Sequence, residues 1–133
     1  MDIERLYGLA LKASSASYSP YSRFRVGAAL ECSDGTVFTG TNIENRSFGL
    51  TVCAERSAVS AAVGAGHRDF VGIVVATPDA SYPVSPCGAC RQVLSEFLGP
   101  EATVAFGASY RDLVVTTMGA LLPNDALHEL KER

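Results

Sequence analysis

The chain has 133 residues, 47% of them hydrophobic and 19% charged, which predicts a single domain over residues 1–133 with a sizeable core. Its 11 basic and 14 acidic side chains give a net charge of −3, and no basic run occurs, which disfavours a nucleic-acid partner. The longest apolar stretches, such as residues 71–76, are far too short to span a bilayer, so no membrane association is expected.

The first part of the chain predicts a helix followed by a β-hairpin. Apolar side chains recur at helical spacing over residues 2–17, and a cluster of Ser, Tyr and Pro that ends at Pro20 stops the helix. Residues 25–32 and 36–42 have the composition of strands, and residues 33–35, Ser-Asp-Gly, have the composition of a hairpin turn. We therefore expect the two strands to pair antiparallel.

The rest of the chain alternates between helices and strands. Residues 53–63 are rich in Ala, Glu and Arg and predict a helix, whereas 71–77 form a short β-branched run typical of a buried strand. Residues 87–98 predict a helix that a Gly-Pro pair ends, and 103–106 and 113–117 predict two further strands. This order indicates an α/β sandwich of about five strands with helices on its faces.

Two short motifs indicate a metal centre. Cys53 and Glu55 lie in Cys-Ala-Glu, and Cys87 and Cys90 lie in a later Pro-Cys-Gly-Ala-Cys that begins at Pro86. A proline fits just ahead of a first helical turn, and residues three apart share one helix face, so both later sulfur atoms can reach one ion. A catalytic zinc takes three protein ligands and leaves the fourth position to water. Cys53, Cys87 and Cys90 make up such a set.

Other uses of the four cysteines compete with this interpretation. Two disulfides are disfavoured because no secretory signal precedes residue 20, so a reducing cytoplasm is the expected location. Cys87 and Cys90 alone would suit a redox pair, or a closed structural site of four thiolates with Cys53 and Cys32. Cys32 lies in a predicted strand, where a lone cysteine is usually a small core residue. The added Cys-Ala-Glu and the leading proline favour catalytic zinc.

The motifs together resemble a known family. Residues 53–56, Cys-Ala-Glu-Arg, combined with 86–92, Pro-Cys-Gly-Ala-Cys-Arg-Gln, are similar to the zinc-dependent cytidine deaminases, the small nucleoside enzymes of pyrimidine salvage. Residues 21–29 and 39–45 also match family patterns in order and spacing, so the resemblance covers roughly residues 18–123. It implies a three-layer sandwich in which a mixed five-stranded sheet has helices on both faces.

The resemblance also implies an activity and a cofactor. The expected reaction is hydrolytic deamination of cytidine and 2′-deoxycytidine to uridine and 2′-deoxyuridine plus ammonia, with one Zn²⁺ per subunit. Zinc lowers the pKa of a bound water, and a nearby carboxylate collects the released proton. Glu55 lies two residues from Cys53, so it should stand near the ion without being a ligand. The resemblance makes Glu55 the residue that carries the proton to ring N3.

Three residues are candidates for substrate binding. Asn42 and Glu44 lie at alternate positions, so both can point to the same side of an extended segment, and an amide beside a carboxylate suits a ribose hydroxyl. The resemblance gives both of them that role. It also places Phe24 against the pyrimidine ring, where stacking contributes on the order of 1 to 3 kcal/mol.

Two arginines are candidates for electrostatic support of the zinc thiolates. Three thiolates bring three negative charges to a dication, which should make a bound water less acidic than three neutral histidines would. Arg56 and Arg91 each directly follow a motif residue, so they can donate hydrogen bonds to sulfur and withdraw electron density. We hypothesise that Arg56 contributes most to offsetting the negative charge of the thiolates and that Arg91 contributes second.

The chain departs from the family pattern at two places. Phe48 stands where family members commonly have Tyr, and Ala126 and Leu127 lie where an aromatic residue is usual. In similar enzymes that aromatic residue reaches the pocket of a neighbouring subunit, and the short members with three cysteine ligands are homotetramers. The resemblance therefore implies a homotetramer and leaves the contribution of Leu127 open.

Two other functions remain alternatives. A related deaminase could act on another cytosine compound, such as an aminonucleoside antibiotic, with an altered ribose site. A zinc-stabilised scaffold without enzymatic activity would give Glu55 no task. Asn42 and Glu44 favour plain nucleosides.

Overall fold

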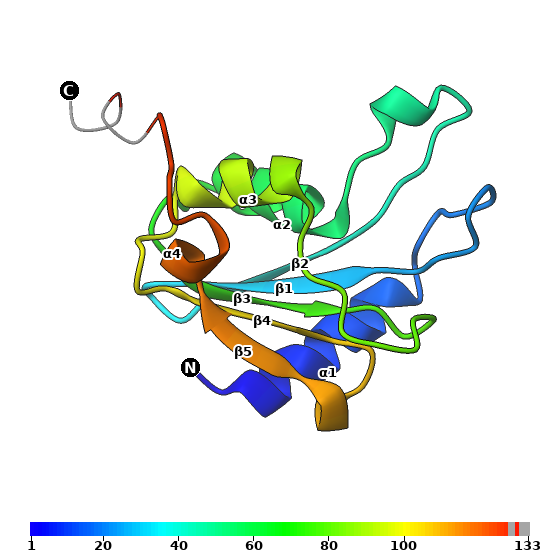
Figure 1. Ribbon diagram of the computed structural model, residues 1–133, viewed down its shortest axis with the longest axis horizontal. Helices are drawn as coiled ribbons and strands as arrows, with labels where there is room; N and C mark the ends of the chain where they lie inside the picture. Colours follow the sequence, from blue (N-terminus) through cyan, green and yellow to red (C-terminus); the bar gives the residue numbers. More distant parts are fainter. Residues whose placement is uncertain (128–129, 131–133) are drawn as a thin grey trace.

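The computed structural model describes residues 1–127 and 130, which form one mixed sheet with helices on both faces (Figure 1). The strands lie in the order β2-β1-β3-β4-β5. Their bounds are Gly27–Cys32 for β1, Val37–Thr41 for β2, Phe70–Ala76 for β3, Thr103–Gly107 for β4 and Val114–Thr117 for β5. β3 and β4 pair in parallel, and the other neighbouring strands pair antiparallel. The mixed five-stranded sheet expected from the sequence is confirmed.

The helices form the two outer layers. One helix, α1, covers one face of the sheet, while α2 and α3 cover the other with the short α4 beside them (Figure 1). Their bounds are Ile3–Ser14 for α1, Ala54–Gly64 for α2, Gly88–Ser95 for α3 and Met118–Leu121 for α4. Two 3₁₀ turns, Phe48–Leu50 and Tyr110–Asp112, complete the described elements. The predicted three-layer sandwich is thus confirmed. Within the described residues, no helix has the length and apolarity needed to cross a membrane.

Both faces of the central strands are buried, which explains why they read as nearly continuous apolar runs. Leu6 and Ala10 of α1 pack against Val74 on one face of the sheet. Ile73 of β3 and Leu94 of α3 belong to the larger core on the other face. Side chains alternate between the two faces along a strand, so neighbouring residues of β3 enter different cores.

Several predicted boundaries were too long. The helix expected over 2–17 ends at Ser14, whose hydroxyl donates to the carbonyl of Leu11 at 2.5 Å, and tighter turns follow. The helix expected over 87–98 ends at Ser95 because the backbone continues in turns that return to Leu94. Hydroxyl side chains offer the backbone such local alternatives to a continued helix, which propensity alone does not locate. The short helix α4 and the two 3₁₀ turns were not predicted.

A glycine lets α2 lie close to the sheet. A Cβ atom added to Gly40 of β2 would come within 2.4 Å of the Ala58 nitrogen and 2.5 Å of the Ala54 oxygen, both in the α2 backbone. Neither backbone atom can move without displacing the helix. Gly40 therefore sets how closely α2 packs on β2.

We expect Gly40→Ala to lower the free energy of unfolding by about 2 to 3 kcal/mol, because the new methyl group overpacks a contact between two backbones. Urea denaturation measures this difference. Gly8→Ala is the matched control, since it lies within α1 and its added Cβ meets nothing within 4 Å. That change should stabilise the protein by up to about 1 kcal/mol. Equal stability of the two variants would contradict the close approach at Gly40.

Candidate metal centre

The two cysteine motifs meet where two helices begin. Cys53 is the N-cap residue of α2 and Cys87 is the N-cap residue of α3, and neither thiol makes a capping hydrogen bond. Cys90 lies in the first turn of α3 and is fully buried. The positive ends of both helix dipoles therefore lie at the thiol cluster, where they favour negative charge and the binding of a metal by sulfur.

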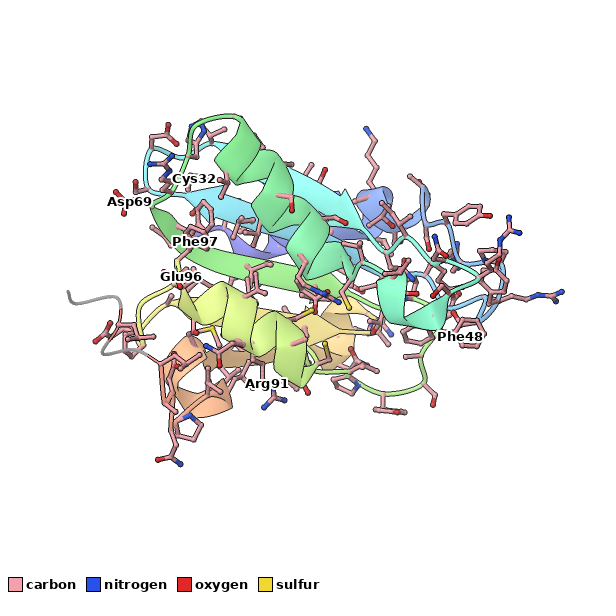
Figure 2. The ribbon with its side chains drawn as sticks, turned by 90° about the horizontal axis from the view of Figure 1, so that it is seen from above. Cys32, Phe48, Asp69, Arg91, Glu96 and Phe97 are labelled. Carbon is pink, nitrogen blue, oxygen red and sulfur yellow. The ribbon has the colours of Figure 1, made fainter. Side chains whose placement is uncertain are left out.

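The three thiols fit a zinc ion. The Sγ atoms of Cys53, Cys87 and Cys90 all lie within 4.8 Å of one another. Tetrahedral ligands at a Zn–S distance of about 2.3 Å stand about 3.8 Å apart, so only small side-chain rotations separate this cluster from a zinc site. All four cysteines are free thiols. Cys32 is outside the cluster, near the C-terminal end of α2 (Figure 2), so it is a core residue as expected.

The sulfur atoms influence one another's ionisation. A hydrogen bond from the Cys90 thiol, followed by one from the Arg56 guanidinium, lowers the pKa of Cys53. The same bond to Cys53, together with burial, raises the pKa of Cys90. The thiol of Cys90 thus keeps its proton beside the Cys53 thiolate. A bound dication is the kind of charge that removes such a proton, because coordinating thiols are deprotonated outright.

The two candidate arginines take different positions. Arg56 Nη2 donates to Cys53 Sγ at 3.2 Å, the contact expected of an arginine that supports a thiolate. Arg91 instead donates to three oxygen atoms: to the Pro86 carbonyl from Nε at 2.8 Å, to the Leu121 carbonyl from Nη1 at 2.9 Å and to Ser85 Oγ from Nη2 at 2.9 Å. Arg91 therefore fastens the segment ahead of Cys87 to α4, rather than donating to sulfur as predicted.

Glu55 lies beside the thiols in the first turn of α2, and only 4% of its surface is exposed. Burial raises the pKa of Glu55 to about 7, because a carboxylate loses hydration when it leaves water. Burying an acid costs free energy, so a buried acid calls for an explanation. Next to the three thiols, Glu55 can exchange protons with groups bound there.

A cavity of about 180 Å³ opens beside the thiols. Its apolar wall comes from five residues, Phe24, Val26, Ala54, Val75 and Val84. The cavity also reaches Cys53, Cys87 and Glu55. An apolar cleft with a few convergent polar groups is the usual form of a small-molecule site.

The predicted substrate residues are only partly gathered at this cavity. Phe24 and Asn42 line it, whereas Glu44 is not among its lining residues. Asn42 Nδ2 donates to the Phe24 carbonyl at 2.7 Å, and its Oδ1 accepts from the backbone of Val26 at 3.0 Å. Asn42 therefore holds in place the segment that carries Phe24.

Glu44 holds the same segment from a second position. Its Oε1 accepts from the backbone N–H groups of Tyr21 at 3.0 Å and Ser22 at 3.1 Å, and its Oε2 accepts from the Ser22 hydroxyl. These bonds, the Ser22 hydroxyl first, lower the pKa of Glu44. The carboxylate is thus already engaged with its own chain.

Several cavity residues were not singled out from the sequence, among them Thr51, Thr77 and Ser85. For Thr77 a signal existed. It stands at the carboxyl end of a predicted strand, the edge at which ligands bind in sheets with parallel strands. Thr51 and Ser85 lie in connecting segments whose course the sequence does not specify.

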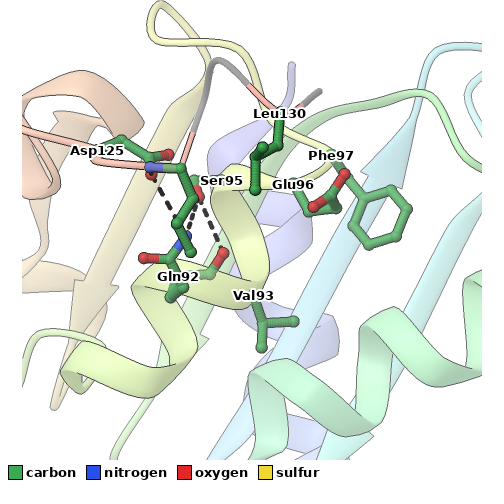
Figure 3. A pocket seen from close by; sticks show the side chains of 8 residues that line it. Gln92, Val93, Ser95, Glu96, Phe97, Asp125 and Leu130 are labelled. Atoms are coloured by element: carbon green, nitrogen blue, oxygen red, sulfur yellow. Dashed lines mark hydrogen bonds between the residues drawn. The ribbon is translucent and has the colours of Figure 1, made fainter. Parts of the chain in front are cut away.

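A larger hollow, of about 460 Å³, lies between α3 and the chain near its C-terminus (Figure 3). Gln92 Nε2 donates there to Asp125 Oδ1 at 3.4 Å, and Leu127 is one of the lining residues. The described lining residues include no thiol or imidazole. This hollow is therefore separate from the metal centre, and Leu127 lies outside the 180 Å³ cavity of its own chain.

Comparisons with known proteins agree with this geometry. Residues 1–107 match the family described as the cytidine and deoxycytidylate deaminase zinc-binding region. The chain is 48% identical over 123 residues to a cytidine deaminase of Halalkalibacterium halodurans, covering 92% of each protein. The crystal structure of cytidine deaminase from Burkholderia pseudomallei is similar with a TM-score of 0.88 and 44% identity, over 93% of this chain and 98% of that one. A blasticidin-S deaminase of Bacillus cereus is 34% identical over 77% of this chain and 76% of that protein.

The fold and the cluster of thiols define a zinc-dependent deaminase class. The chain belongs to the cytidine and deoxycytidylate deaminase family, and zinc is its metal. The family resemblance and the cofactor expected from the motifs are thus confirmed. The roles of the individual residues stay predictions.

Proposed function

We propose that this protein catalyses the hydrolytic deamination of cytidine and 2′-deoxycytidine to uridine and 2′-deoxyuridine, with release of ammonia. One observation carries the proposal: a buried acid, Glu55, lines the same cavity as the thiols of Cys53 and Cys87. A scaffold needs no such acid. The similarity to cytidine deaminases of matching length supports the substrate class.

Cys53, Cys87 and Cys90 are the proposed zinc ligands, since their sulfur atoms are the cluster that fits the ion. When bound, zinc acts as a Lewis acid and lowers the pKa of a coordinated water toward about 7. Arg56 donates to Cys53 Sγ and is the proposed electrostatic support, since its charge offsets part of the negative charge of the thiolates. Arg91 is proposed to support the thiolates indirectly, by fixing the segment ahead of Cys87 through its bonds to the Pro86 carbonyl and Ser85 Oγ.

Glu55 is the proposed carrier of protons. Its carboxylate accepts a proton from the attacking water and gives it to N3 of the pyrimidine, which makes C4 more electrophilic. The hydroxyl oxygen adds at C4, and Glu55 then takes the remaining proton of that hydroxyl. It delivers this proton to the amino group as the C4–N bond breaks and C4=O forms. One water is consumed and one ammonia leaves. The position of Glu55 beside the thiols supports this role.

Phe24 is proposed to pack against the pyrimidine ring, as its place in the cavity wall supports. Asn42 is proposed to contact a ribose hydroxyl with the amide hydrogen that is not bonded to the Phe24 carbonyl. For Glu44 the same role rests on the family resemblance, and a free lone pair on its carboxylate is the acceptor it would use. All three residues belong to one hydrogen-bonded unit, so they should act together.

We also propose that the chain is a single catalytic domain which assembles as a homotetramer and works in the cytoplasm in pyrimidine salvage. An exposed apolar group lies at one end of the molecule, where Phe48 is 73% and Leu50 67% exposed, and the ring centroids of Phe48 and Tyr21 are 5.7 Å apart (Figure 2). Such a group favours burial against another copy. Sedimentation equilibrium that returns the mass of one chain would overturn the assembly.

The activity is tested by ultraviolet absorbance. Purified zinc-loaded protein should remove the absorbance band of cytidine and of 2′-deoxycytidine and release one ammonia per nucleoside. Blasticidin S in a parallel cuvette tests the alternative that the similarity to a blasticidin-S deaminase raises. Deamination of blasticidin S alone would replace the proposed substrate. Bound zinc with no deamination of any cytosine compound would instead support the scaffold.

A further inference from the structure

Buried polar side chains gather at the cavity. Four polar or charged residues are buried among those the structure describes, and Asn42, Glu55 and Thr77 of these line the cavity. The fourth, Ser14, donates to the Leu11 carbonyl within α1. Burying a polar group costs free energy unless it is hydrogen-bonded, so each of the three needs a partner.

Thr77 is the one whose partner is missing. Asn42 is bonded to its own chain, and Glu55 has a proposed part in the reaction. The hydroxyl of Thr77 is buried and makes no hydrogen bond with any described residue. Its backbone is fully engaged, because the N–H donates to the Gly107 carbonyl at 3.1 Å and the carbonyl accepts from the Ala80 N–H at 3.1 Å. The residue is thus held in place while its hydroxyl stays unpaired.

The direction of the side chain follows from the strand that it extends. Thr77 comes directly after β3, and its backbone continues the pairing of β3 with β4. Alternate residues of a strand share a face, so Thr77 lies on the face of Val75, which also lines the cavity. Ala76 packs on the opposite face, in the core formed with α1. The hydroxyl therefore belongs to the side of the sheet that carries the thiols.

We propose that the Thr77 hydroxyl is a specificity-determining group that hydrogen-bonds the pyrimidine base in the cavity. The inference rests on the proposed function and adds a residue to it. A hydroxyl both donates and accepts, so it can serve a ring or carbonyl acceptor as well as an amino group. The polar atoms of the base would give the Thr77 hydroxyl the hydrogen-bond partner that it lacks within the chain. Sites that hydrogen-bond a substrate in this way discriminate more strongly than apolar contacts do.

The test compares Thr77→Val, which keeps the shape and removes the hydroxyl, with Thr77→Ser, which keeps the hydroxyl. In Thr77→Val, we expect the KM for cytidine and the Kd for uridine, the latter measured by calorimetry, each to rise about tenfold. Thr77→Ser should stay within about threefold of the wild type. Thr116→Val, the same change in β5 at the edge of the sheet, is the control and should bind normally.

Stability separates this role from a structural one. If the Thr77 hydroxyl hydrogen-bonds the ligand, Thr77→Val should have a Tm equal to or above that of the wild type. The substitution then removes a buried hydroxyl that has no hydrogen-bond partner in the free protein. A lower Tm together with an unchanged Kd means that the hydroxyl holds a structural water, and this overturns the inference. Wild-type protein that binds uridine without deaminating cytidine refutes the proposed function alone, since the Kd values still decide for Thr77. Absence of nucleoside binding refutes both.

Discussion

Glu55→Gln should lower the turnover of cytidine by at least about a thousandfold, while zinc remains bound at one ion per chain. The amide has the shape of the acid but cannot move a proton, and general acid–base catalysis contributes typically 10² to 10⁴ in rate. The loss should reach the upper part of that range because the same side chain acts at two steps. Steady-state absorbance and elemental analysis on the same preparation measure the two quantities.

The matched control for this variant is Glu4→Gln. Glu4 also lies in the first turn of a helix, but α1 covers the opposite face of the sheet. Its replacement should leave turnover unchanged. Normal activity in Glu55→Gln would remove the acid from the mechanism, and loss of zinc in that variant would show that the carboxyl group serves the metal instead.

Cys90→Ala should reduce zinc affinity by at least about a hundredfold and abolish activity, because loss of a ligand exceeds the 10- to 100-fold cost of losing an outer hydrogen-bond partner. Competition with a chromogenic chelator measures the affinity. Cys32→Ala is a matched control, since both cysteines are buried and both variants lose the same atom. Cys32→Ala should keep one zinc per chain and full turnover, with only a loss of core packing. Equal zinc binding by the two variants would show that the cluster is not the metal site.

Sequence reasoning reached the metal centre because its signal is local. Cys87 and Cys90 are three residues apart on one helix, so their spacing alone places both sulfur atoms on one face. Cys53 lies at the start of another helix, and only the combined motif pattern joined it to the other two before the fold was known. The strands of the sheet were found for a similar reason, since β-branched and apolar residues gather in short runs that turn residues separate. Gly35 lies in the predicted hairpin turn and has a φ of 88°, a left-handed conformation that glycine adopts readily.

The contacts that the sequence did not predict depend on distant partners. Arg91 follows a zinc motif, yet its guanidinium is held by the Leu121 carbonyl from thirty residues later. Glu44 has the chemistry of a ribose ligand, but a turn at Ser22 engages its carboxylate. Thr77 reads as the end of an apolar strand, and only the folded chain reveals its hydroxyl as unpaired. The residue type alone does not determine which partner a polar side chain will hydrogen-bond in the folded chain.

Cys53 and Cys87 are the N-cap residues of two different helices, so an ion bound to both is a removable cross-link. The two residues are thirty-four positions apart, so one ion adds a link between α2 and α3, which already pack in one core. Binding energy of this kind adds directly to folding energy. Removal of zinc should therefore lower the free energy of unfolding of this protein as well as its activity.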